Sequence, residues 1–150
     1  MKESPQTKRL EDILRSSKMV AGGFLGSDQR SLTEIIDNDL AKVAKSGFTI
    51  EQIVARMKEI TKIAVSFLGN WAEFEKDKLI KVEEAKGSLV CPWPHIGRFA
   101  KRVTYVKLIK TGQITKWSDL NIHMIEKHNF FEGKGAIFRI EPDDLIEAIF

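Results

Sequence analysis

Apolar residues in the first half of the chain recur every three or four positions, which is the period of an amphipathic α-helix. This pattern predicts a short helix over residues 7–19 and a second helix that begins at Ser31 and stops at Gly47. Thr49 and Gln52 fit a capping box, which opens a third helix. The apolar positions of this third helix form one continuous stripe, here called the apolar seam: Ile50, Ile53, Met57, Ile60, Ala64 and Phe67.

The apolar seam needs a surface to pack against, because a helix in water is stable only when its apolar face is covered. Two partners would serve: the second helix folded back on the third, or a second copy of the chain. We expect the second copy, so the sequence predicts a homodimer formed through residues 50–67.

The second half of the chain has the composition of strands. Residues 78–84 and 88–91 resemble two strands joined by a turn at Lys86 and Gly87, and β-branched residues predict a strand over 103–109. Ser118 caps a short helix over 119–127, residues 136–140 resemble a last strand, and Pro142 opens a C-terminal helix. Helices followed by strands predict an α+β fold with an antiparallel sheet.

Composition indicates one globular domain. The 150 residues are 43% hydrophobic and 30% charged, which is typical of a single compact unit. We expect this unit to be bipartite, helical over about 7–69 and mixed over about 70–150. The longest apolar stretch, residues 19–26, is too short to cross a bilayer, and one cysteine excludes an internal disulfide. We therefore expect a soluble, cytoplasmic protein without a membrane partner.

Charge is unevenly distributed. Residues 85–118 contain seven Lys or Arg and no Asp or Glu, whereas acidic residues are frequent on both sides. A local positive potential favours encounter with anions, although solvated surface lysines explain the same pattern. The principal functional hypothesis is a binding module for a small anionic ligand or partner. Its binding residues would be Arg98, Lys101 and Arg102, with Trp93 and Phe99 lining the pocket.

Every cysteine and histidine falls in one quarter of the chain. Cys91, His95, His123 and His128 together supply the sulfur and nitrogen donors of a tetrahedral zinc site. Their spacing argues against such a site, because five residues of α-helix place His123 and His128 about 140° apart. The alternative is a set of partly buried histidines that form ordinary hydrogen bonds.

A thiol-dependent or metal-dependent enzyme is the second functional hypothesis. Positive charge lowers the pKa of a thiol, and Cys91 has cations but no acids near it in sequence, with His95 in reach as a base. The competing interpretation is that Cys91 is a small buried hydrophobic residue at the end of a strand. Convergence of the cysteine with the three histidines in the folded chain would favour the metal or enzyme hypothesis.

Nucleic-acid binding is the third hypothesis. Trp93, Phe99, Tyr105 and Trp117 alternate with basic residues, a combination that stacks on bases while contacting phosphates. Residues 40–57 also resemble a helix-turn-helix, with Gly47 in the turn. The outward positions of its second helix carry mixed charge, which is unlike a DNA-reading surface.

Overall fold

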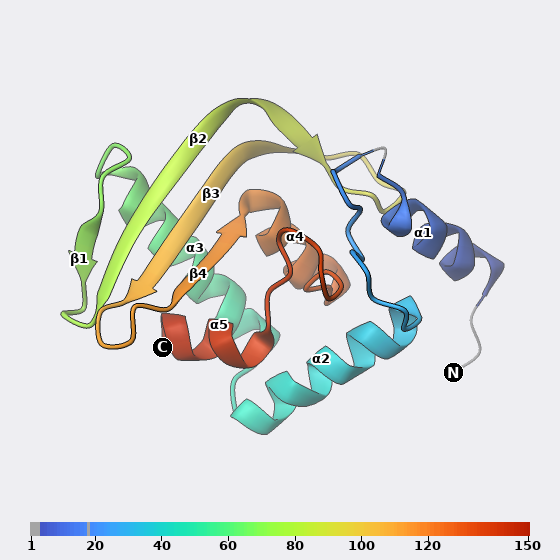
Figure 1. Cartoon of the computed structure of the whole chain (residues 1–150), viewed down its shortest axis with the longest axis horizontal. Helices are drawn as coiled ribbons and strands as arrows, with labels where there is room; N and C mark the ends of the chain where they lie inside the picture. Colours follow the sequence, from blue (N-terminus) through green and yellow to red (C-terminus); the bar gives the residue numbers. More distant parts are fainter. Residues whose placement is uncertain (1–3, 18) are drawn as a thin grey trace.

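The computed structural model describes residues 4–17 and 19–150. Helices come first and an antiparallel sheet with short helices follows, which confirms the predicted α+β class. Figure 1 shows a curved sheet that arches over helices gathered beneath it. In chain order the elements are α1 (Pro5–Arg15), α2 (Leu32–Ser46), α3 (Ile50–Val65), β1 (Ala72–Phe74), β2 (Lys78–Val90), β3 (Arg98–Leu108), β4 (Ile114–Ser118), α4 (Asp119–His128) and α5 (Pro142–Ile149).

Capping residues set the helix starts. Ser31 accepts a hydrogen bond from the Glu34 backbone at the start of α2, and Thr49 and Gln52 form the predicted reciprocal capping box of α3. Gly47 ends α2 in the left-handed region, with φ of 83°. Helix α1 ends at Arg15, earlier than predicted, and Lys18 of the predicted helix lies outside the described residues.

The sheet has the order β1-β2-β3-β4, and each pair is antiparallel. The predicted turn at Lys86 and Gly87 is wrong, because β2 continues through these residues as one strand. Its pairing with β3 shifts between Glu84 and Ser88, and Gly87 has φ of 101°, so the glycine forms an irregularity within the strand. The predicted strand over 136–140 is also wrong: the Arg139 amide bonds back to the Ala136 carbonyl in a turn.

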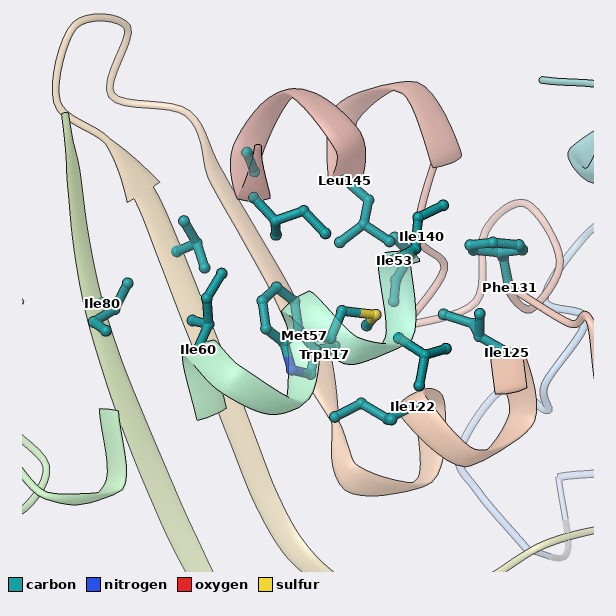
Figure 2. Close-up of a cluster of buried hydrophobic side chains, with 14 of the residues drawn as sticks. Ile53, Met57, Ile60, Ile80, Trp117, Ile122, Ile125, Phe131, Ile140 and Leu145 are labelled. Carbon is teal, nitrogen blue, oxygen red and sulfur yellow. The ribbon is translucent and has the colours of Figure 1, made fainter. Parts of the chain in front are cut away.

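The middle of the apolar seam is buried inside the chain, whereas Ile50 is half-buried and Phe67, which follows the end of α3, is 40% exposed. Ile53, Met57 and Ile60 have no exposed surface and pack beneath the sheet and against α4 and α5, as Figure 2 shows. Helix α2 packs mainly on α5, so α2 and α3 are not packed as the two helices of a DNA-binding helix-turn-helix. The covering surface that motivated the homodimer is therefore supplied by the same chain.

A second apolar cluster lies where β2 ends and β3 begins. Here α1 and the segment after it contact α4 (Figure 1). Its buried members are Leu14, Phe24, Leu25, Leu32, Ile35, Cys91, Leu120, Met124 and Phe130. This cluster brings the chain between β2 and β3 against α4. Across residues 4–17 and 19–150, no helix has the length and apolarity needed to span a membrane.

Candidate metal centre

Cys91, His95, His123 and His128 converge on one point. The donor atoms of the four side chains all lie within 4.8 Å of one another. The Cys91 Sγ is 3.5 Å from the His128 Nε2, and the His95 Nε2 is 3.3 Å from the His128 Nε2 and 3.1 Å from the His123 Nε2. The sequence therefore named four residues that the fold brings together.

Two segments of the chain supply the donors. Cys91 and His95 belong to the connection between β2 and β3, where Pro92 and Pro94 restrict the backbone and the His95 amide donates to the Trp93 carbonyl. His123 and His128 lie on α4, whose start is fixed by a capping box of Ser118 and Asn121. A connecting loop and a helix thus meet through these four side chains.

The spacing argument against convergence fails for a geometric reason. His123 and His128 are five residues apart on α4, with His128 the last residue of the helix, yet their ring centroids are only 5.3 Å apart. Helical side chains lean toward the N-terminus of the helix, so the ring of His128 lies back over the turn before it. The imidazole is also long enough to place its Nε2 away from its own helix position, toward a shared centre.

Three of the six donor-to-donor distances are close to the edges of a zinc coordination shell. With Zn–N of about 2.0–2.1 Å and Zn–S of about 2.3 Å, a tetrahedron has N–N edges of about 3.4 Å and N–S edges of about 3.5 Å. Two N–N separations are 3.1 and 3.3 Å and one N–S separation is 3.5 Å. The other three separations are at most 4.8 Å, so the four donors are close enough to close around one metal ion.

Hydrogen bonds account for the cluster less well than a metal does. The His95 Nδ1 lies 3.2 Å from the Ile96 carbonyl oxygen, which it approaches as a donor. A neutral His95 then has one lone pair on Nε2, yet this atom contacts both His123 and His128. One lone pair accepts one good hydrogen bond, so it does not satisfy both contacts. A metal ion would instead be bound by one lone pair from each of the three rings. The Nδ1 contact also gives His95 the tautomer that a metal ligand needs.

Aromatic rings surround the donors. The Trp93 ring stacks on His128 at 4.1 Å between centroids, and Phe99 lies 4.5 Å from His123. Burial and the neighbouring imidazoles lower the pKa of His128 to about 4 and lower the pKa of His123. Burial also raises the pKa of the Cys91 thiol. Of the two aromatic residues predicted to line an anion pocket, Trp93 packs on His128, and Phe99 packs on His123.

The three cations predicted to bind an anion do not converge. Arg98 donates to the Ser88 hydroxyl, and Arg102 forms two-pronged hydrogen bonds with Asp119. Lys101 lies near Gly87 and lines a different cavity from Arg102. The charge pattern of residues 85–118 did not predict the ion pairing of Arg102, because its acidic partners lie just outside that segment.

A cleft of about 490 Å³ adjoins the histidine cluster on the α3 side. His123, Phe99 and Arg102 contribute to its walls. The other lining residues are Lys58, Thr61, Lys62, Val65, Asp119, Ile122 and Glu126.

The thiol of Cys91 is buried, with 3% of the residue exposed. Its contact in the cluster is His128, at 3.5 Å, rather than the predicted base His95. Of the aromatic residues proposed to stack on nucleic acid, Trp117 is fully buried and donates to Thr61 in the core. Tyr105 stays at the sheet surface beside Lys81.

Sequence reasoning missed Glu132, a buried carboxyl at the end of the second cluster. In the sequence it stands beside Gly133 and Gly135, a pattern typical of an exposed turn, and glutamate is usually exposed. The sequence carries no signal that distinguishes it.

Comparison with known proteins adds no relative. No family model matches the chain, and neither a curated protein nor a solved structure is significantly similar to it.

Proposed function

We propose that this protein binds one zinc ion through Cys91, His95, His123 and His128. The observation that carries the proposal is the convergence of four donor atoms within 4.8 Å, with three of their six separations close to the edges of a tetrahedral shell. One thiolate and three imidazoles suit zinc, whereas magnesium and calcium prefer oxygen ligands. A tetrahedral arrangement also favours zinc over copper(II), which prefers a tetragonal one.

The role of the metal follows from the ligand count. Four protein ligands complete the shell of a structural zinc site, while a catalytic site keeps one position open for water or substrate. The ion would join the connection between β2 and β3 to α4, two segments that are otherwise held by the second apolar cluster. We therefore propose a zinc-stabilised binding module rather than a zinc enzyme.

The proposed ligand of this module is a small anion in the cleft beside His123. Lys58, Lys62 and Arg102 line the cleft against Asp119 and Glu126, which leaves one net positive charge. Phosphate should raise the melting temperature more than chloride at equal ionic strength, and Lys62→Ala should remove that difference. Equal shifts for both proteins would contradict the anion proposal and leave the zinc proposal standing.

The zinc proposal is tested with protein that carries no polyhistidine tag. Zinc content is measured by atomic emission after dialysis, and affinity by competition with a chromogenic chelator. We expect one zinc per chain, and Cys91→Ser or His128→Ala should weaken binding by more than the 10–100-fold typical of outer-shell changes. Lys127→Ala is the matched control, since this exposed residue lies on α4 between the two histidines. Unchanged affinity in both ligand variants would refute the site.

A further inference from the structure

A second cavity, of about 330 Å³, is lined by residues of β2, β4 and the segments that follow α1 and α4, and the buried residue Glu132 lies in its wall. Phe24, Leu89, Leu120 and Phe138 give it apolar walls, and the exposed side chain of Lys101 lies at its edge. We call it the Glu132 cavity. A well-formed apolar cavity with one convergent polar group is the usual form of a small-molecule site.

Glu132 is the polar group that needs an explanation. Only 5% of the residue is exposed, and its Oε2 accepts one hydrogen bond, of 2.7 Å, from the Asn121 Nδ2. The Asn121 Oδ1 accepts from the backbone and hydroxyl of Ser118, so the amide nitrogen must face Glu132. Among residues 4–17 and 19–150, no cation forms a salt bridge with this carboxyl.

The backbone holds the carboxyl in this place. Glu132 has φ of 68°, a left-handed conformation that is unfavourable for a residue with a side chain. Arg139 donates to the Glu132 carbonyl oxygen rather than to the carboxyl. The next residue, Gly133, donates its amide to the Phe24 carbonyl, and a Cβ on it would meet the Leu25 carbonyl oxygen at 2.4 Å, so the backbone beside Glu132 packs closely against residues 24 and 25. Packing therefore imposes a conformation that places a carboxyl in the cavity wall.

Such a carboxyl is costly in the empty protein. Removal from water disfavours its charged form, and burial raises the pKa of Glu132 to about 7. One amide donor leaves most of its acceptor capacity unused. A ligand that brings a cationic donor would satisfy the carboxylate, and an apolar body on that ligand would cover the aromatic and aliphatic walls.

We propose that the Glu132 cavity binds a small apolar molecule with a primary ammonium group, which Glu132 receives as a charge-assisted hydrogen bond. The aromatic or branched aliphatic part would lie against Phe24, Leu89 and Phe138. This site does not depend on the zinc proposal, because none of the four zinc ligands lines the cavity.

The test uses the full chain as isolated and 2-phenylethylamine as the probe, followed by amide chemical shifts at pH 7.5. We expect saturable shifts that map to residues around Phe24, Leu89 and Leu120. 2-Phenylethanol has the same apolar part but no charge. Its affinity should be lower by a factor of about ten or more, as expected for the loss of a charged hydrogen bond.

Two variants separate binding from folding. Glu132→Gln should weaken 2-phenylethylamine binding about 10–100-fold and reduce its advantage over the alcohol. Ala21→Trp adds bulk at an exposed position of the cavity lining and should block both probes while the fold is kept. Glu147→Gln, on the exposed side of α5, is the control and should bind like the natural protein. Absence of saturable binding, or equal affinity for amine and alcohol, would overturn the proposal.

Discussion

Three of the four proposed zinc ligands have pKa values that their surroundings shift: Cys91, His123 and His128. His123 and His128 have lowered pKa values because burial and neighbouring imidazoles disfavour their cations. Both rings are therefore neutral at pH 7 and ready to bind. Cys91 is different, since burial raises its pKa and the thiol must lose its proton to become a ligand.

Zinc binding at pH 7 should consequently release about one proton, mainly from Cys91. Calorimetric titration in buffers of different ionisation enthalpy measures the number released. Cys91→Ser should abolish most of this release while His95→Ala retains it. Release that is unaffected by Cys91→Ser would mean that the thiol is not a ligand.

The zinc-free protein should lose stability in acid because of His128. Its pKa is about 4 in the folded chain and near 6.5 when unfolded. Between these values only the unfolded chain takes up the proton, so the free energy of unfolding falls as pH drops from about 6.5 to about 4. Urea denaturation at pH 7 and pH 5 measures the loss, which His128→Asn should reduce. An equal loss in wild type and variant would assign the effect to other groups.

Residue types pointed to the four residues that converge, whereas residue spacing pointed away from their convergence. The concentration of Cys91 and the histidines in one quarter of the chain pointed to a common site. The helical angle between His123 and His128 argued against a common site. This angle describes where the side chains leave the helix, and it takes no account of where the ring atoms of a long side chain lie. Glu132 was hidden, since only tertiary packing makes that carboxyl unusual.

At the scale of elements, capping chemistry was predictable and strand pairing was not. Ser31, Thr49 and Pro142 marked helix starts because their effects are local. Gly87 was interpreted as a hairpin turn, although the partner of β2 is β3, which lies further along the chain. β4 was missed, and Trp117 within it was expected at the surface although the core covers it completely.

Removal of zinc should loosen one region and leave the main core intact. The connection 91–97 and the last turn of α4 would lose their shared metal, whereas α3 stays packed in its own apolar cluster. Hydrogen exchange should therefore accelerate in both segments after chelation and stay unchanged in the middle of α3. In Cys91→Ser protein the chelator should have no such effect. Uniform acceleration across the chain would contradict a local role for the metal.

At the scale of the whole molecule, the burial of the apolar seam determines whether we expect the protein to self-associate. Met57 and Ile60 are fully buried within one chain, so we expect a monomer by light scattering at micromolar concentration. Met57→Lys should lower the free energy of unfolding by more than about 4 kcal/mol, because it buries an unpaired charge. If the unmodified protein is a dimer and the Met57→Lys variant is a folded monomer, the apolar seam is instead an interface between two copies of the chain.

We propose that one sulfur and three nitrogens hold the zinc ion. X-ray absorption at the zinc edge of the loaded, tag-free protein measures this shell directly. We expect one Zn–S distance of about 2.3 Å and three Zn–N distances of about 2.0–2.1 Å, with the sulfur contribution lost in Cys91→Ser. A shell of nitrogen and oxygen alone, or a coordination number of six, would contradict the proposal.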